Sequence, residues 1–106
     1  MVSIESLKPL IVERLKPLAP EKIILFGSYA RGKQTPQSDI DLFIIKDIDK
    51  KEARGFKIAL RRATEDLVER YGIGFDFIVA NRDLLNERED YFYRKEIAEE
   101  GQVLYE

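Results

Sequence analysis

The chain has 106 residues, of which 18 are basic and 20 acidic, and 44% of its residues are hydrophobic. This length predicts a single domain over residues 1–106 with one ordinary core, and the hydrophobic content excludes a disordered chain. The net charge of −2 gives no general attraction to anionic polymers or membranes. Direct nucleic-acid binding is therefore not expected.

The sequence contains no cysteine and no histidine. Disulfides, cysteine metal sites and histidine-based catalysis are therefore excluded. Any bound metal must have oxygen ligands, which favours Mg²⁺, Mn²⁺ or Ca²⁺. No apolar run approaches 18 residues and no signal segment is visible at the N-terminus, so we expect a cytoplasmic protein without a membrane span.

Apolar residues at three- and four-residue steps from Ile4 onward predict an amphipathic helix. We expect this helix to begin near Ser6, because Pro9 then falls in the first turn, where a proline is tolerated. The run 22–26 is continuously apolar and predicts a buried strand. Ser28 follows it after a glycine, and serine is a preferred N-cap for a helix.

The remaining pattern continues this alternation of strands and helices. A turn precedes a β-rich run at 39–45, and a long amphipathic helix is predicted over 51–70. A third strand is expected over 73–79, one or two helices over 84–99, and a short last strand over 103–105.

Gly27 and Ser28 directly follow the first predicted strand. A glycine there permits a sharp turn and the close approach of a ligand, and the free N–H groups at a helix start attract phosphate. Ser28 adds a hydroxyl, and Arg31 lies one turn further on. Taken alone, the pair also fits an ordinary turn and helix cap.

Asp39 and Asp41 lie two residues apart in a predicted strand, so their side chains share one face while Ile40 and Leu42 enter the core. Neighbouring carboxylates repel each other unless a cation or a shared proton relieves them. The pair therefore suits Mg²⁺. The alternative is a solvated strand end with acidic turn residues.

Asp76 is a lone acid inside the apolar third strand, with Gly74 on the same face. An acid is unfavourable there unless it has a function or a partner. The alternative is an exposed or ion-paired aspartate.

Residues 27–33 also match the phosphate-binding pattern G-x-x-x-x-G-K after a strand. That pattern requires Ser or Thr in the next position to hold Mg²⁺, where this chain has Gln34. Pro36 would also end the long helix that such a loop begins. We therefore reject this assignment.

Taken together, Gly-Ser at 27–28, Asp-Ile-Asp at 39–41 and Phe-Asp-Phe at 75–77 resemble the DNA polymerase β-like nucleotidyltransferase superfamily. The most similar group is the minimal nucleotidyltransferases, and the resemblance covers nearly the whole chain. It implies an α+β fold, with a small mixed β-sheet packed against helices, in agreement with the alternation above.

The resemblance also implies the roles of the site residues. Gly27 and Ser28, with Arg31 less directly, would hold the triphosphate of ATP. Asp39, Asp41 and Asp76 would be the catalytic and metal-binding residues, converging on two Mg²⁺ ions opposite the glycine–serine turn. The acceptor hydroxyl would attack the α-phosphate, and pyrophosphate would leave.

Larger members of the superfamily add a helical domain that grips the base or the acceptor, so here a second protein is expected to help. Proteins resembling this chain often act as the antitoxin of a HEPN-domain toxin and adenylylate one of its tyrosines. Two alternatives stay open. The chain could neutralise a partner by docking alone, or it could act on RNA ends or a small molecule such as an aminoglycoside.

Two further features have simpler interpretations. The aromatic residues at 91–93 are expected in the core, because aromatic side chains are usually at least partly buried. Arg61 and Arg62 are expected on a solvated helix face.

Overall fold

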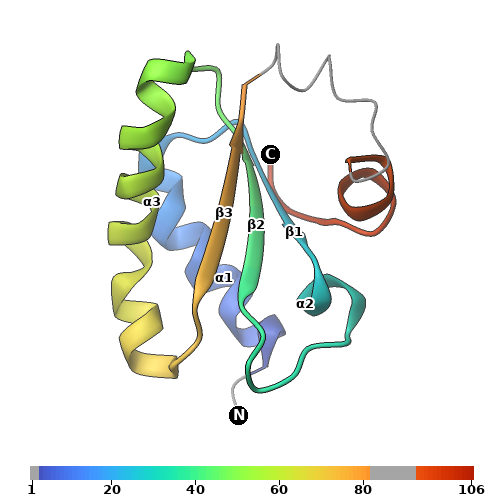
Figure 1. The fold of residues 1–106 in the computed structure, drawn as a ribbon. Coiled ribbons are helices and arrows are strands. Elements are labelled where there is room, and N and C mark those ends of the chain that lie inside the picture. Colours follow the sequence, from blue (N-terminus) through green and yellow to red (C-terminus); the bar gives the residue numbers. More distant parts are fainter. Residues whose placement is uncertain (1–2, 82–92) are drawn as a thin grey trace.

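The computed structural model describes residues 3–81 and 93–106. A four-stranded sheet forms its centre, with helices α1 and α3 covering one face (Figure 1). The elements in chain order are α1 (Ile4–Leu15), the 3₁₀ turn η1 (Lys16–Leu18), β1 (Lys22–Phe26), α2 (Ser28–Arg31), β2 (Ile40–Ile45), α3 (Lys50–Tyr71), β3 (Phe75–Ala80), the π-helix η2 (Tyr93–Glu99) and β4 (Gln102–Tyr105).

The strands are arranged in the order β3-β2-β1-β4. β1 pairs antiparallel with both β2 and β4, whereas β2 and β3 run parallel. The parallel pair requires a crossover connection, which α3 provides. This arrangement confirms the expected α+β fold with a small mixed sheet.

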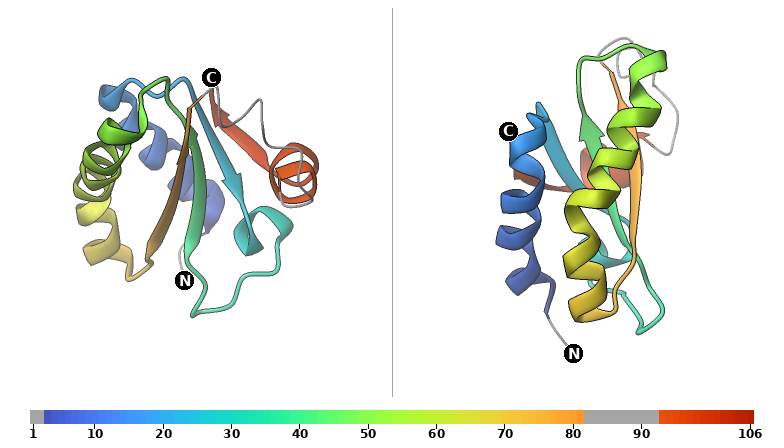
Figure 2. Two further views of the ribbon diagram at one scale, coloured as in Figure 1. Left: turned by 45° about the horizontal axis from the view of Figure 1, so that its top comes forward. Right: turned by 90° about the vertical axis from the view of Figure 1, so that its left-hand side faces the viewer.

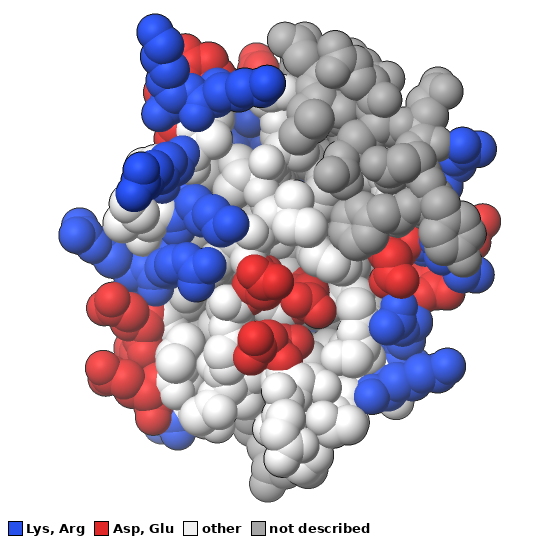
Figure 3. Space-filling view, in the orientation of Figure 1, with Lys and Arg blue, Asp and Glu red and all other residues white. Residues whose placement is uncertain are grey.

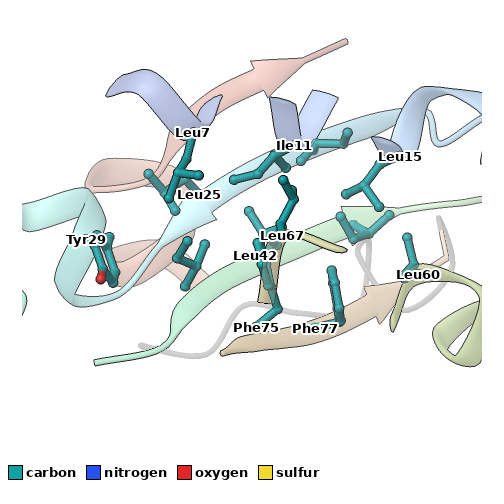
Figure 4. Packing of buried hydrophobic residues seen from close by; sticks show 13 residues of the cluster. Leu7, Ile11, Leu15, Leu25, Tyr29, Leu42, Leu60, Leu67, Phe75 and Phe77 are labelled. Atoms are coloured by element: carbon teal, nitrogen blue, oxygen red, sulfur yellow. The ribbon is translucent and has the colours of Figure 1, made fainter. Parts of the chain in front are cut away.

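One face of the sheet packs against α1 and α3, which lie next to each other (Figure 2). Every second strand residue points to this face, as the two-residue strand period requires. Figure 4 shows how leucines and isoleucines of the helices meet these strand residues. The buried cluster includes Leu7, Ile11, Leu15, Ile23, Leu25, Ile40, Leu42, Leu60, Leu67, Phe75 and Phe77.

The opposite face carries a smaller apolar cluster beneath η2. Ile97 of η2 is 3% exposed and packs with Ile24, Phe43 and neighbouring strand residues. The ring of Tyr93 lies 6.0 Å from that of Phe43, which agrees with the expected core position of this aromatic residue. The other two aromatic residues of that prediction lie outside the described residues.

The first helix begins earlier than predicted. Ser3 caps it by accepting a hydrogen bond from the Ser6 N–H, so the helix starts at Ile4 and Pro9 lies in its interior. The expected start near Ser6 was therefore wrong. The helix tolerates the cost of Pro9 because Leu7, Ile11 and Leu15 are all fully buried against the sheet, and tertiary packing overrides local propensity.

The other predicted elements are confirmed to within two residues, except that 84–92 lie outside the described part. In the described residues every helix is too short or too charged to cross a membrane. Arg61 and Arg62 are exposed on α3, as expected for a solvated face.

Candidate active site

Strand pairing brings the three predicted aspartates to one end of the sheet. The antiparallel register sets Asp41 opposite Phe26, the last residue of β1, so the turn at Gly27 comes next to it. The parallel register sets Asp41 directly opposite Asp76 on β3. Asp39 precedes β2 by one residue and lies two residues before Asp41.

All three aspartates avoid the core. Ile40 and Leu42, which alternate with them on β2, are fully buried, whereas Asp41 is half-buried and Asp39 and Asp76 are exposed. Figure 3 shows a compact group of acidic side chains over β2 and β3, surrounded by uncharged surface. The strand alternation predicted from the sequence is therefore confirmed.

Two glycines leave the space that these carboxylates occupy. A Cβ atom on Gly27 would collide with Oδ2 of Asp41, and one on Gly74 would lie 2.6 Å from Oδ1 of Asp39. Gly27 also has φ +77° and ψ −155°, a backbone conformation essentially restricted to glycine. Both positions therefore require glycine if the carboxylates are to keep their places.

The helix after Gly27 differs from the prediction in one detail. Gly27 itself is the N-cap, and Ser28 is the first helical residue, so the assignment of Ser28 as cap was wrong. Gly27 takes this role because the turn needs its unusual backbone conformation. Tyr29 is buried in the main core and fixes the orientation of α2. Because Gly27 is the N-cap, the Ser28 hydroxyl has no capping role.

The carboxylates interact strongly. Partial burial, followed by the negative charges of Asp76 and Asp39, raises the pKa of Asp41 to about 6, while the nearby Arg31 acts in the opposite direction. The negative charges of Asp76 and Asp39 oppose ionisation of Asp41, because a like charge destabilises the ionised form. A bound cation would relieve this repulsion.

In the described residues, no group of three or more acidic side chains already has the arrangement of a metal site. The aspartates are neighbours, but they are not closed around one point. The donor set is nevertheless all oxygen and acidic, which matches the ligand preference of Mg²⁺.

Arg31 lies at the last position of α2 and contacts a residue that the sequence analysis did not identify. Its Nη1 donates to both carboxylate oxygens of Glu96 on η2, at 2.8 and 2.7 Å. The Gln102 side chain also donates to the carbonyl of Ala30, at 2.9 Å. No sequence signal marks Glu96, because it lies in a charged run typical of a solvated helix.

The chain matches the family model described as "Nucleotidyltransferase domain" over residues 7–104. The chain belongs to this nucleotidyltransferase family. The matched range includes strands β1 to β3, most of β4 and every residue of the candidate site. The resemblance inferred from the glycine–serine and aspartate positions is thereby confirmed.

Two relatives of the nucleotidyltransferase come from Methanocaldococcus jannaschii. The first, named "Putative protein adenylyltransferase MJ0604", is 40% identical over 85 residues, which span 80% of this chain and 78% of that protein. The second, "Putative protein adenylyltransferase MJ1305", is 44% identical over 64 residues, 58% of this chain and 43% of that protein. Together with the family match, these relatives identify the chain as a nucleotidyltransferase enzyme.

Two solved structures share the nucleotidyltransferase fold, each with a TM-score of 0.60 over 92% of this chain and 72% of that chain. One is a crystal structure of a mutant of the toxin–antitoxin MntA-HpeT, with 20% identity. The other is a toxin–antitoxin with AMP-PNP, with 22% identity. Both support the α+β architecture described above.

The raised pKa of Asp41 makes a prediction about stability in metal-free buffer. Below the ordinary aspartate pKa near 3.8, the contribution of protonated Asp41 to the stability of the folded state is fully present. This contribution is lost as the pH rises through about 6, where Asp41 ionises in the folded protein. Asp41→Asn should therefore be more stable than wild type at pH 8, by about 1 kcal/mol after allowance for solvent screening. The difference should shrink at pH 4, as measured by urea denaturation.

Asp66→Asn is the matched control, because a hydrogen bond from Arg14 lowers the pKa of the exposed Asp66. Its contribution is present above the ordinary pKa and lost as the pH falls, so this variant should be less stable than wild type at pH 8. An Asp41→Asn variant that is no more stable than wild type at pH 8 would contradict the proposed repulsion.

A second prediction concerns the effect of Gly74→Ala on activity. In Gly74→Ala the new Cβ forces the carboxylate of Asp39, a candidate site residue, to move, and displacements near 1 Å within an active site cost about 100-fold in rate. Nucleotide transfer should fall at least about tenfold while the circular dichroism spectrum stays native. Gly55→Ala, on α3 with open space around it, should keep full activity and gain about 0.5–1 kcal/mol in unfolding free energy. Equal activities of the two variants would contradict the role of Gly74.

Proposed function

We propose that this enzyme transfers AMP from ATP to an acceptor hydroxyl, with Mg²⁺ held by Asp39, Asp41 and Asp76. The proposal rests mainly on the grouping of three carboxylates at one end of the sheet, beside the turn at Gly27. Placing Asp39 and Asp76 beside Asp41 raises the pKa of Asp41 and is costly for the fold, and a functional site is where such a cost is expected.

In this proposal Gly27, Ser28 and Arg31 hold the triphosphate. The first N–H groups of a helix have no partner within it, and the Ser28 hydroxyl lies beside them at the start of α2. Gly27 has no side chain that could block a phosphate. Arg31 follows three residues later and therefore shares the face of α2 on which Ser28 lies.

The three aspartates would hold two Mg²⁺ ions, as in two-metal phosphoryl-transfer sites. When bound, Mg²⁺ would neutralise charge on the triphosphate and lower the pKa of the attacking hydroxyl. Among the described residues the three carboxylates do not already form a ligand group, so holding the ions would require small side-chain movements. Asp39 and Asp76 are exposed and free to make such movements.

The proposed reaction requires no histidine. The acceptor oxygen forms a bond to the α-phosphorus, the bond from that phosphorus to the bridging oxygen breaks, and pyrophosphate leaves with the electron pair. Asp76 lies at the outer strand of the group and would receive the hydroxyl proton. Positioning and charge neutralisation supply most of the rate in reactions of this class.

We further propose that the acceptor is a tyrosine of a HEPN-type toxin and that this chain is its cytoplasmic antitoxin. The relatives named as protein adenylyltransferases support a protein acceptor. The structural neighbours, one a toxin–antitoxin and the other a toxin–antitoxin with AMP-PNP, support a toxin partner and an ATP-like donor. The HEPN class of the partner rests on the resemblance alone.

A transfer assay tests the proposal directly. The chain is purified with the protein that co-purifies with it, then incubated with Mg²⁺ and ATP labelled at the α-phosphate. Intact mass spectrometry should show a gain of one or more AMP units on the partner. Asp41→Asn should lower this transfer by at least about 100-fold, as expected for loss of a group that stabilises transition-state charge.

Asp66→Asn is the control, because it makes the same chemical change at an exposed position of α3. This variant should retain wild-type turnover. Wild-type turnover by Asp41→Asn would refute the metal assignment. Transfer to tRNA or an aminoglycoside in place of the partner would replace the proposed acceptor. Tight partner binding with all label left free would instead favour neutralisation by docking.

A further inference from the structure

Glu96, from the far end of the sequence, holds Arg31 of α2. Both Glu96 oxygens accept from the same nitrogen, Nη1, at 2.7 and 2.8 Å, and Oε2 of Glu100 lies 3.6 Å from it. The two partners are 65 residues apart in sequence. The contact therefore exists only because the C-terminal segment folds back across the sheet.

The fold gives Glu96 a fixed position. The next residue, Ile97, is buried in the second apolar cluster and anchors η2 to the sheet. The lack of a side chain at Gly101 lets the chain pass close to Ile24 as it turns into β4, since a Cβ atom there would lie 2.7 Å from a methyl carbon of Ile24. Gln102 then donates to the Ala30 carbonyl and accepts from Lys8. The C-terminal segment thus holds α2 at two successive residues.

Arg31 keeps donors for a second anion. A guanidinium carries five N–H donors, and Glu96 uses only those of Nη1. Within residues 3–81 and 93–106, no acceptor contacts Nε or Nη2 of Arg31. The same guanidinium acts electrostatically on Asp41 and favours its ionised form.

We propose that Glu96 is a positioning residue, which fixes one edge of the Arg31 guanidinium so that its other edge meets the phosphates of the bound nucleotide. This inference rests on the proposed function, in which Arg31 contacts the triphosphate. An arginine with one edge held loses less side-chain entropy when it binds phosphate. Glu96 therefore contributes to nucleotide affinity without touching the nucleotide.

A purely structural role for the pair would have a different signature. Arg31 and Glu96 side chains are 33% and 26% exposed, and ion pairs at such partly exposed sites contribute only about 0–1 kcal/mol to stability. Loss of Glu96 should therefore leave the melting temperature nearly unchanged. An effect on nucleotide binding can then be separated from an effect on folding.

The test compares Glu96→Gln with Glu99→Gln, an exposed residue of the same helix that forms an ion pair with Lys95. With the co-purified partner as acceptor, Glu96→Gln should raise KM for ATP about tenfold while kcat changes less than about threefold, the pattern of lost uniform binding. Glu99→Gln should stay within twofold of wild type in both constants. Calorimetry with AMP-PNP and Mg²⁺ should show the same tenfold loss of affinity for Glu96→Gln.

A double variant separates positioning from independent contributions. Arg31→Ala should weaken AMP-PNP binding at least as much as Glu96→Gln, and Arg31→Ala with Glu96→Gln should be no weaker than Arg31→Ala alone, since both act through one group. Unchanged or tighter AMP-PNP binding by Glu96→Gln would overturn the inference. So would a Glu96→Gln variant that loses stability but not affinity.

The binding measurement also keeps the two proposals distinct. If wild type binds AMP-PNP but transfers no nucleotide to any acceptor, the proposed function fails, while the tenfold difference in binding still supports the role of Glu96. If wild type transfers AMP and Glu96→Gln has an unchanged KM, only the inference about Glu96 fails.

Discussion

The parallel pairing of β2 with β3 sets Asp41 directly opposite Asp76, and this enforced proximity of carboxylates is the constraint on which the rest of the site depends. Asp39 adds a third negative charge from the start of β2. Such a group is unfavourable without a cation. The buried residues that alternate with the acids, Ile40 and Leu42, hold the strand in a single register, because a one-residue slip would exchange core and acidic faces.

The surrounding elements accommodate this constraint. Gly27 and Gly74 lack the atoms that would displace the carboxylates, and α2 begins at the same end of the sheet with Tyr29 anchored in the core. The C-terminal segment then packs over the second face and holds α2 through Glu96 and neighbouring contacts. The site is thus assembled from segments that are far apart in the sequence, all within the range that matches the nucleotidyltransferase family.

The sequence predicted features that depend on local pattern. Strand alternation around Asp41 and the isolated acid at Asp76 follow from a two-residue period, and both positions were correct. The start of the first helix was missed because capping by Ser3 and burial of one face outweighed the penalty of Pro9. The contact between Arg31 and Glu96 could not be predicted, since it depends on how the C-terminal segment folds back and no periodic pattern records that path.

The most direct test of the account is the position of the metal. Crystals grown with Mn²⁺ and a non-hydrolysable ATP analogue would show the ions by their anomalous scattering. We expect two Mn²⁺ ions within about 2.2 Å of carboxylate oxygens contributed by Asp39, Asp41 and Asp76, somewhat longer than the Mg²⁺ distance, with the triphosphate on the turn at Gly27. Bound analogue with Mn²⁺ held away from these three carboxylates would contradict the account.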